Sequence, residues 1–399
     1  MLSEKRILLG VTGGIAAYKA AELIRSFVKA GARVRVVMTE SACRFITPMT
    51  LGTLSGGEVY TDTFETTRDG EIPHIDLAYW ADLVVVAPAT ANILGKIAGG
   101  MGDDLLSTTM LAVTAPVLLC PAMNSNMYAN PAVQANIKKL ADRGCRILDA
   151  DSGDLACRTT GPGRLPSPED ILEVVETMFA KKDLAGVRVL VTAGPTQEPL
   201  DPVRFITNHS SGKMGFALAQ AARRRGADVT LVSGPVSLDA PPGVELVPVQ
   251  DARSMRDAVM NRLAGSDVII KAAAVSDYRP SETSLSKIKK SDETLTVTLE
   301  RNPDILASVG EEKGNRILVG FAMETEDLVE NAQRKLSSKN LDLIVANDLG
   351  EPGAGFRHDT NVVRILDREG GDETLPLMEK KEVAERIIDR IVALLEKRA

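Results

Sequence analysis

A repeated alternation of two patterns constrains the fold of this chain more than any other feature. Runs of β-branched and aliphatic residues alternate with segments whose apolar residues recur at helical spacing. This alternation predicts α/β layers built around a mainly parallel sheet. In the first half, strands are predicted at residues 6–12, 33–38, 81–88, 115–121 and 145–149. Between the first two strands, the predicted inner face of a helix consists of Ala16, Ala20, Leu23, Ile24 and Phe27.

The alternation restarts after residue 182, which predicts a second domain. The first half closes with a helix at residues 168–179, and the charged segment KKDLAG follows as a short linker. Further strands are predicted at residues 188–196, 227–235, 244–249, 267–275, 316–324 and 342–348. A final amphipathic helix is indicated by Val383, Ile387, Ile388, Ile391 and Leu395. Because 399 residues exceed the usual size of one core, we predict two doubly wound, Rossmann-like domains, residues 1–181 and 182–399.

The composition is typical of a soluble globular protein. Hydrophobic residues make up 44% and charged residues 25% of the chain, and the net charge of -7 argues against nucleic acid or an anionic membrane as the main partner. No apolar run approaches the roughly 18 residues of a spanning helix, and the N-terminus lacks a signal-like apolar segment, so we expect a cytoplasmic protein. The four cysteines form no CxxC pair, which favours neither a disulfide framework nor a zinc site.

Polar residues follow three predicted strands of the first half. The stretch GVTGGIAAYK lies where the first strand meets a helix, so its glycines would let backbone N–H groups approach a phosphate. It is not a GxGxxG motif, and a tight turn without a ligand is the alternative. The hydroxyl and amide groups that follow the next two strands belong to Thr39, Ser41, Thr90 and Asn92. Because the carboxyl ends of parallel strands share one edge of a sheet, these groups predict a nucleotide or flavin pocket.

Three other residues of the first half have both a structural and a chemical interpretation. His74 precedes a predicted helix with the only tryptophan, Trp80, and is either a satisfied structural histidine or an acid/base group. Asn124 in PAMNSNMY follows a strand and could hold a carboxylate or an amide. Cys157 in GDLACRTTGPGR is either an incidental thiol or a reactive one, because nearby cations lower the pKa of a thiol.

The second half opens with an unusually long polar insertion, TAGPTQEPLDPVRFITNHSSGKMG. A plain dinucleotide site would have a compact glycine-rich turn and an acidic residue after the second strand, but that strand ends in Ser-Gly-Pro, which makes NAD a minority interpretation. The insertion ends in a donor-rich cluster suited to an anionic acyl or phosphate group. This cluster consists of Asn208, His209, Ser210, Ser211 and Lys213.

Charged residues further along indicate triphosphate handling. Asp277 follows the fourth strand of the second half, and Lys287 lies in the polar run SKIKK. A lysine run is often only a solvated face. This run lies near Asp277, NPDIL and GFAMET, which favours a phosphate site. Lys335 and Lys339 are four residues apart and therefore lie on one face of a predicted helix.

The ordered set of motifs resembles a known family. GVTGGIAAYK, His74 in PHIDL, TAN followed by GDDLL, PAMNSNMY and the Cys157 loop resemble the homo-oligomeric flavin-containing cysteine decarboxylases. Over nearly its whole length the chain resembles the bacterial bifunctional phosphopantothenoylcysteine decarboxylase/phosphopantothenate-cysteine ligases of coenzyme A synthesis. It departs from the common pattern at Tyr128, where tryptophan is frequent, and at residues 158–160, where a glycine usually follows the cysteine.

For the first domain the resemblance implies FMN-dependent decarboxylation of 4'-phosphopantothenoylcysteine to 4'-phosphopantetheine. His74 would be the acid/base group, Asn124 would bind the substrate carboxylate, and Cys157 would protonate the enethiolate intermediate. The residues expected to bind FMN are Gly13, Gly14, Ile15, Thr39, Ser41, Thr90 and Asn92.

For the second domain the resemblance implies ligation of 4'-phosphopantothenate with cysteine through an acyl-cytidylate made from CTP. Asn208 would bind the acyl-cytidylate, Asp277 would hold the nucleotide with Mg²⁺, and Lys287 would neutralise phosphate. The remaining residues expected to bind CTP are Ala273, Pro303, Asp304, Ile305, Phe321, Lys335 and Lys339. Residue types alone do not exclude ATP.

The resemblance also implies a homo-oligomer, with trimeric flavin domains and dimeric ligase domains combined into a dodecamer. The alternatives are a flavin prenyltransferase-like or peptide-cysteine decarboxylase first domain, and a non-catalytic flavin-binding regulatory subunit. A flavin prenyltransferase-like domain should lack the His74, PAMN and Cys157 set, and a peptide-cysteine decarboxylase should lack the second half. A regulatory subunit arises by loss of the histidine or the cysteine. Both residues and the second half are present here.

Overall fold

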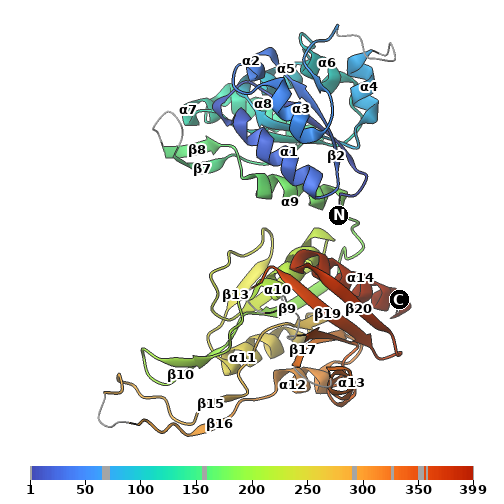
Figure 1. Ribbon diagram of the computed structural model, residues 1–399. Helices are drawn as coiled ribbons and strands as arrows, with labels where there is room; N and C mark the ends of the chain where they lie inside the picture. Colours follow the sequence, from blue (N-terminus) through green and yellow to red (C-terminus); the bar gives the residue numbers. More distant parts are fainter. Residues whose placement is uncertain are drawn as a thin grey trace. The chain divides into compact units, whose positions relative to one another are not determined.

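The computed structural model describes residues 2–64, 72–154, 160–289, 294–324, 328–348, 355 and 358–398. The chain divides into two compact units, Met1–Phe179 and Ala180–Ala399 (Figure 1). Cys157 and Lys290, the last residue of the SKIKK run, lie outside the described residues. In the described part of the chain, no helix has the length and apolar character needed to cross a membrane.

The first unit is built on one parallel sheet. Its strands are β1 (Arg6–Val11), β2 (Arg33–Met38), β3 (Val59–Tyr60), β4 (Leu83–Ala89), β5 (Val117–Pro121) and β6 (Arg146–Ile147). They lie in the order β3-β2-β1-β4-β5-β6, and every neighbouring pair is parallel. The five strands predicted from the sequence are therefore confirmed, while β3 was not predicted. The strand order reverses between β1 and β4, and such a reversal opens a crevice at the carboxyl ends of the strands.

Helices cover both faces of this sheet because its strand residues are buried on both sides. One face packs against α1 (Lys19–Lys29), α3 (Pro48–Ser55) and α9 (Pro168–Phe179). The other face packs against α4 (Pro73–Trp80), α5 (Ala91–Gly99), α6 (Leu105–Ala112) and α8 (Pro131–Asp142). The predicted inner helix face is confirmed by the burial of Ala20, Leu23, Ile24 and Phe27. Ala16 lies in a short 3-10 turn, Ile15–Tyr18, that precedes α1 and is only half-buried.

Three short elements complete the first unit near the strand ends. They are α2 (Glu40–Cys43), α7 (Ser125–Tyr128) and an antiparallel hairpin of β7 (Asp151–Asp154) and β8 (Thr160–Arg164). Residues 155–159, with Cys157, belong to the connection between β7 and β8 and lie outside the described residues.

The second unit has a larger sheet with the same design. Its strands are β9 (Arg188–Ala193), β12 (Asp228–Ser233), β13 (Glu245–Pro248), β14 (Val268–Lys271), β17 (Ile317–Glu324), β18 (Leu343–Asp348), β19 (Thr360–Asp367) and β20 (Asp372–Glu379). The order is β13-β12-β9-β14-β17-β18-β19-β20. Pairing is parallel as far as β18 and antiparallel for β19 and β20, which were not predicted. The predicted mainly parallel α/β class is confirmed for both units.

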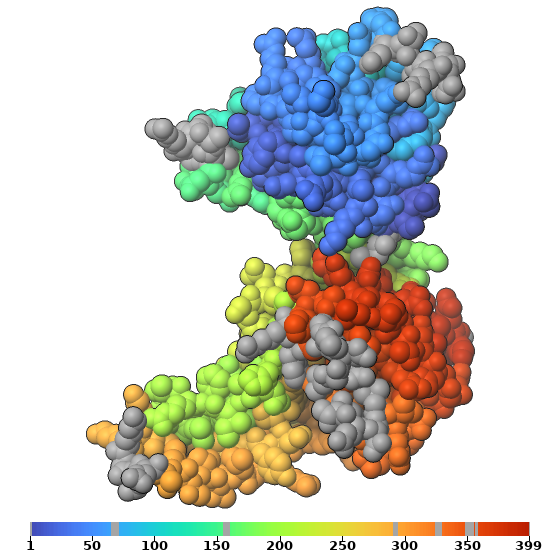
Figure 2. Space-filling model, viewed as in Figure 1, coloured from blue at the N-terminus to red at the C-terminus, as the bar shows by residue number. Residues whose placement is uncertain are grey.

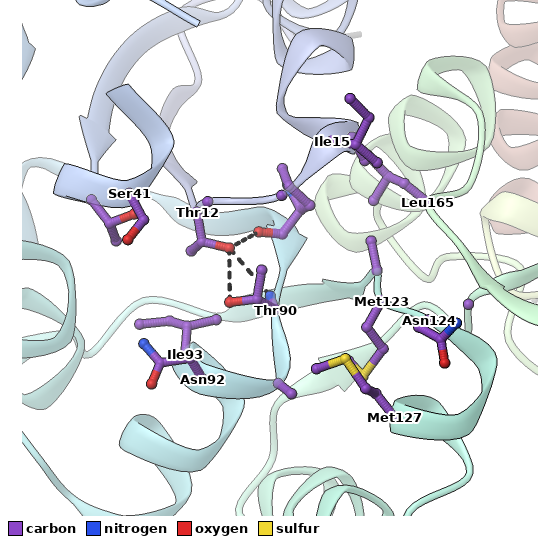
Figure 3. A pocket seen from close by; sticks show the side chains of 18 of the residues that line it. Thr12, Ile15, Ser41, Thr90, Asn92, Ile93, Met123, Asn124, Met127 and Leu165 are labelled. Carbon is purple, nitrogen blue, oxygen red and sulfur yellow. Dashed lines mark hydrogen bonds between the residues drawn. The ribbon is translucent and has the colours of Figure 1, made fainter. Parts of the chain in front are cut away.

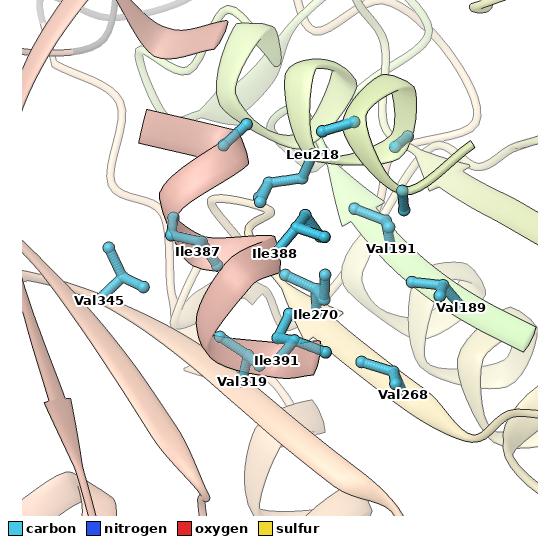
Figure 4. Close-up of a cluster of buried hydrophobic side chains, with 14 of the residues drawn as sticks. Val189, Val191, Leu218, Val268, Ile270, Val319, Val345, Ile387, Ile388 and Ile391 are labelled. Carbon is cyan, nitrogen blue, oxygen red and sulfur yellow. The ribbon is translucent and has the colours of Figure 1, made fainter. Parts of the chain in front are cut away.

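Two helix layers enclose this second sheet. The helices on one face are α10 (Lys213–Arg224) and α14 (Lys380–Arg398), and those on the other are α11 (Ala252–Leu263), α12 (Ile305–Glu312) and α13 (Leu328–Ser338). Figure 4 shows Ile387, Ile388 and Ile391 of α14 packed over Val191 and Ile270 of the sheet. The predicted C-terminal amphipathic helix is thus confirmed, and it seals one face of the core.

The long polar insertion forms part of an arm that projects from this unit (Figures 1 and 2). One ribbon pairs β10 (Gln197–Pro199) with β11 (Phe205–Thr207), and the other pairs β15 (Tyr278–Pro280) with β16 (Leu299–Arg301). The two ribbons are joined where the Ser284 backbone N–H donates to the Leu200 carbonyl oxygen at 3.0 Å. The insertion therefore adopts regular structure instead of a loose loop.

The predicted charged linker is partly incorporated into the second unit. The Leu184 side chain is fully buried in the core beneath α10 and α14. Asp183 forms an ion pair with Arg225 at 2.6 Å, and this hydrogen-bonded guanidinium lowers the pKa of Asp183. Burial of a leucine and pairing of a carboxylate attach the end of the linker to the sheet-covering helices.

Candidate active sites

A cavity of about 880 Å³ lies at the strand-order reversal of the first unit, at the carboxyl ends of β1, β2, β4 and β5. All seven residues predicted to bind a flavin line it: Gly13, Gly14, Ile15, Thr39, Ser41, Thr90 and Asn92. Asn124 lines it too. Figure 3 shows Ser41, Thr90, Asn92, Met123 and Asn124 around this space. The predicted convergence of three polar strand ends therefore occurs.

Thr12 organises the centre of this cavity and was not singled out in the sequence. Its hydroxyl donates to the Pro88 carbonyl oxygen at 2.6 Å, and it accepts from the Thr90 backbone N–H at 3.2 Å (Figure 3). The Thr12 side chain is buried. These bonds fix the end of β1 against the end of β4 and so tie together the two loops that would contact a ligand. Its position immediately before Gly13 is the signal that could have identified it.

Gly13 permits a close backbone approach. A Cβ atom on Gly13 would lie 2.4 Å from Cβ of Ser41, which is closer than carbon atoms can pack. A Cβ on Gly14 would meet only Thr90, at 3.6 Å, so its surroundings are open. The first glycine is thus required for packing of the β1 turn against α2, and the second leaves the space beside the turn clear.

Two lysines line the same cavity in different electrostatic settings. Lys19 donates to the Leu165 carbonyl oxygen at 2.9 Å, and burial together with nearby Arg164 lowers its pKa. Lys96 pairs with Asp103 and Asp104, each at 2.7 Å. Burial opposes the charge on Lys96, but the two carboxylates outweigh it and raise the lysine pKa. The aspartate pair of the GDDLL motif therefore neutralises Lys96 at the cavity wall.

Asn124 lies at the junction of β5 and the β7–β8 hairpin. Its side-chain oxygen accepts from the Asn126 backbone N–H at 2.9 Å and caps α7. The preceding Met123 N–H donates to the Gly163 carbonyl oxygen at 2.9 Å, which attaches the hairpin to the strand end. The root of the β7–β8 hairpin is thus held at the cavity next to Asn124.

His74 does not belong to the cavity lining within one chain, where the other first-unit candidates gather. It lies in the first turn of α4, and its Nδ1 atom is buried with no hydrogen-bond partner among the described residues. The helix is anchored by Arg35, which pairs with Asp76 at 2.7 Å and stacks over the Trp80 ring at 4.6 Å. A satisfied structural histidine would need a hydrogen bond at Nδ1. Among the described residues His74 has none there, which does not favour the structural interpretation.

A second cavity, of about 450 Å³, lies at the carboxyl ends of β14 and β17 in the second unit. Seven residues predicted to bind the nucleotide line it: Ala273, Asp277, Pro303, Asp304, Ile305, Phe321 and Lys339. Its lining also includes Asn302, the first residue of the NPDIL motif, and Lys271 and Arg301, which sequence reasoning missed. Lys271 is the last residue of a strand whose other members are apolar, and that break in the pattern was the available signal.

Lys339 and Asp304 form an ion pair within this cavity, with Nζ and Oδ2 2.7 Å apart. Although partial burial opposes the charge of Asp304, its bonds to Lys339 and to the Ala307 N–H lower its pKa. Asp304 is also the N-cap of α12. The predicted phosphate-binding lysine is therefore already positioned by a carboxylate from another element.

Three predicted residues of the second domain lie outside the lining of this cavity: Asn208, Lys287 and Lys335. Asn208 is nevertheless tied to it, because its amide donates to the Ala274 carbonyl oxygen at 3.2 Å. Lys287 is exposed in the arm, where the next residue, Ile288, donates from its backbone N–H to Asp201 at 3.1 Å. Lys335 is half-buried on α13. One chain thus gathers most of the predicted nucleotide residues but not all of them.

Comparison with known proteins agrees with this two-unit architecture. A family model described as "Flavoprotein" matches residues 1–180, and one described as "DNA/pantothenate metabolism flavoprotein C-terminal domain" matches residues 184–395. With a cavity at the strand ends of each unit, the chain is a two-domain α/β flavoprotein of pantothenate metabolism. It belongs to the family of bifunctional coenzyme A biosynthesis proteins CoaBC.

Three relatives establish that membership. The CoaBC protein of Bacillus subtilis (strain 168) is 52% identical over 398 residues, covering 99% of this chain and 98% of the relative. The CoaBC protein of Vibrio cholerae is 49% identical over 393 residues, covering 98% of each chain. The CoaBC protein of Escherichia coli (strain K12) is 48% identical over 396 residues, covering 98% of this chain and 97% of the relative.

Proposed function

We propose that the chain catalyses two consecutive reactions of coenzyme A biosynthesis in the cytoplasm. The second domain, residues 182–399, joins 4'-phosphopantothenate to cysteine. The first domain, residues 1–181, decarboxylates the resulting 4'-phosphopantothenoylcysteine to 4'-phosphopantetheine. The observation that carries this proposal is the 52% identity to a bifunctional coenzyme A biosynthesis protein over 99% of the chain, because the match spans both units. The two strand-end cavities, one in each unit, support a separate site for each reaction.

The first cavity has the features that an FMN site requires. Its volume of about 880 Å³ falls within the size range of cofactor sites, and its lining combines apolar side chains with about as many polar and charged ones. Gly13, Gly14 and Ile15 at the β1 turn would hold the phosphate through backbone N–H groups, and Thr39 and Ser41 would add hydroxyl donors. Bound FMN supplies a two-electron acceptor and donor, which a cysteinyl carboxylate lacks on its own.

The first-domain residues then divide the remaining tasks. Asn124, already oriented by the α7 turn, would bind the substrate carboxylate with its amide group. His74 would exchange a proton with the substrate, and its Nδ1, which has no hydrogen-bond partner among the described residues, supports that role. Cys157 would donate a proton to the enethiolate that remains after CO₂ departs. Because His74 does not line the cavity of its own chain, we assign it to the cavity of a neighbouring copy, in accord with a trimer.

In the second domain, a carboxylate must be activated before an amine can displace its oxygen. The carboxylate of 4'-phosphopantothenate would attack the α-phosphate of CTP, which releases pyrophosphate and forms an acyl-cytidylate. The cysteine amine would then attack the acyl carbon, forming the amide and releasing CMP. Asn208 would bind the acyl-cytidylate, and Lys287, Lys335 and Lys339 would neutralise phosphate charge.

Mg²⁺ fits the same cavity. Asp277 is exposed at its edge, and Asp304 is held by Lys339 on another side. Mg²⁺ typically uses one or two protein carboxylates together with substrate phosphates, so Asp277 would complete the ion's coordination with the nucleotide. Lys287, on the exposed arm, would act from a second copy in a ligase dimer. Trimeric first domains and dimeric second domains combine into the proposed dodecamer.

One incubation tests the whole proposal. Full-length protein, loaded with FMN, is mixed with 4'-phosphopantothenate, cysteine and Mg²⁺, with either CTP or ATP, and the products are followed by mass spectrometry. We expect 4'-phosphopantetheine with CTP. Absence of any amide product with both nucleotides would contradict the ligase assignment, and an amide product that is never decarboxylated would contradict the decarboxylase assignment.

A further inference from the structure

Lys271 is a buried lysine in the nucleotide cavity for which neither the fold nor the mechanism above gives a reason. It is the last residue of the central strand β14, and only 6% of its surface is exposed. Its side chain lies on the α11 and α12 side of the sheet. Ile269, two residues earlier on the same strand, packs in that core layer, and side chains two residues apart on a strand face the same side. A lysine in this position is costly because burial removes the hydration of its ammonium group.

Lys271 has no strong acceptor in the described part of the chain. The Met255 sulfur, 3.9 Å from Nζ, is its one hydrogen-bond acceptor there, and a thioether is a weak acceptor. Burial accordingly lowers the pKa of Lys271 to about 7, against a small opposing attraction by Asp304. The Asp304 carboxylate is itself committed to Lys339 and to the Ala307 N–H. A bound ligand is therefore the natural source of the missing acceptor.

The cavity is polarised between an apolar floor and a charged rim. Among the apolar lining residues, Ile305 is almost completely buried, and Val275 and Leu306 pack against the same core. Asp277 and Arg301 are exposed, and the paired Lys339 and Asp304 are partly exposed. A strongly hydrated triphosphate with its metal ion suits the rim, whereas the flat, weakly hydrated nucleobase suits the floor.

We propose that Lys271 is a specificity-determining residue that donates a hydrogen bond to the ring carbonyl oxygen of a pyrimidine base. Cytosine presents a carbonyl oxygen at C2, while adenine has no carbonyl oxygen. When the wrong base binds, the buried donor of Lys271 is left without its acceptor. This costs more binding free energy than an apolar side chain at the same place would. The inference rests on the proposed ligase function and adds the part of the site that selects CTP over ATP.

Equilibrium binding to the full-length protein tests the inference without requiring turnover. Titration calorimetry compares CTP, ATP and pyrophosphate on wild type, K271M and the control K381M. Methionine preserves the length of the buried side chain, and Lys381 is exposed at the start of α14, away from the cavity lining. We expect K271M to weaken CTP about 10- to 100-fold, as for loss of a charged hydrogen bond. Binding of ATP and pyrophosphate should change less than about threefold, and K381M should match wild type in all three.

Several results would overturn the inference. Equal weakening of CTP, ATP and pyrophosphate would assign Lys271 to the phosphates, and an unchanged CTP-to-ATP ratio would remove it from recognition. A wild type that prefers ATP would overturn it as well. Failure of the proposed function would give a different result from failure of this inference. The incubation would yield no amide product, while nucleotide binding and its dependence on Lys271 persisted.

Discussion

At the residue scale, Lys271 illustrates how a functional group can oppose stability. Its pKa is about 7 in the folded chain and near 10.5 when exposed. Between these values the unfolded chain binds more protons than the folded chain, so this lysine destabilises the fold increasingly as the pH falls from 10.5 to 7. Below pH 7 the destabilisation reaches its full value, which is about 1.4 kcal/mol for each unit by which the pKa of Lys271 is lowered. The neighbouring charges Asp304, Lys339, Asp277 and Arg301 all lie on the cavity lining, and the attraction by Asp304 offsets only a small part of this penalty.

The K271M variant should therefore be more stable than wild type at pH 6 to 7, by a few kcal/mol, and the gain should shrink as the pH approaches 10. Differential scanning calorimetry of the full chain across this pH range measures the effect, with K381M as the control. A gain in melting temperature that is the same at every pH would show that methionine merely packs better. A loss of stability at neutral pH would show that Lys271 has an acceptor in the folded protein.

At the scale of elements, the β1 turn shows how backbone contact shapes the flavin cavity. Thr12 ties β1 to β4, and Gly13 packs directly on Ser41 of α2. The two contacts come from adjacent residues, so the turn is fixed on both sides before the chain enters the 3-10 turn and α1. A side chain at Gly13 has no free direction, because it would meet both Cβ and the backbone of Ser41 within 3.0 Å.

The G13A variant should consequently lose flavin. Relief of the clash must move the β1 turn or α2, at a cost of about 1–3 kcal/mol typical of overpacking, and either movement displaces residues that line the cavity. The measurement is the ratio of FMN to protein, by absorbance, after purification. G57A is the matched control, because a Cβ there meets only the Val34 carbonyl oxygen at 3.9 Å. Full flavin content in G13A would contradict the assignment of this turn to the cofactor.

At the scale of the whole molecule, the proposed oligomer follows from the incomplete gathering of site residues in one chain. His74 lies outside the cavity lining that contains Asn124, and Lys287 lies on the arm outside the nucleotide cavity lining. Apolar side chains are also exposed on the first unit, among them Met49, Phe64, Ile72 and Tyr79. Surfaces of this kind are commonly covered by another subunit.

Mixing two inactive variants tests this arrangement. H74N keeps the cavity and N124A keeps the histidine, so each alone should lack decarboxylase activity. When the two are co-expressed, random assortment pairs an intact cavity with an intact neighbouring histidine in about one quarter of the sites, and activity should return to about that fraction of wild type. Activity no higher than the sum of the two separate variants would show that both residues act within one chain.

The sequence by itself determined the parallel strands, the helices between them and the strand-end position of most candidate residues. These features follow from local patterns, because a buried parallel strand needs a continuous apolar run and a sheet-covering helix needs one apolar face. Examples are the buried face of α1 and the confirmed strands β1, β2, β4, β5, β6, β9, β12, β13, β14, β17 and β18. The seven first-cavity residues came together for the same reason, since parallel strands end at one edge.

Only the tertiary structure decided the rest. The antiparallel pairing of β19 and β20 and the two ribbons of the arm depend on partners far along the chain, which a local pattern does not specify. The same holds for the absence of His74 from the lining of its own chain's cavity and for the burial of Lys271 without a strong acceptor among the described residues. Whether a side chain is buried, paired or exposed is set by everything packed around it, and that environment exists only once the chain has folded.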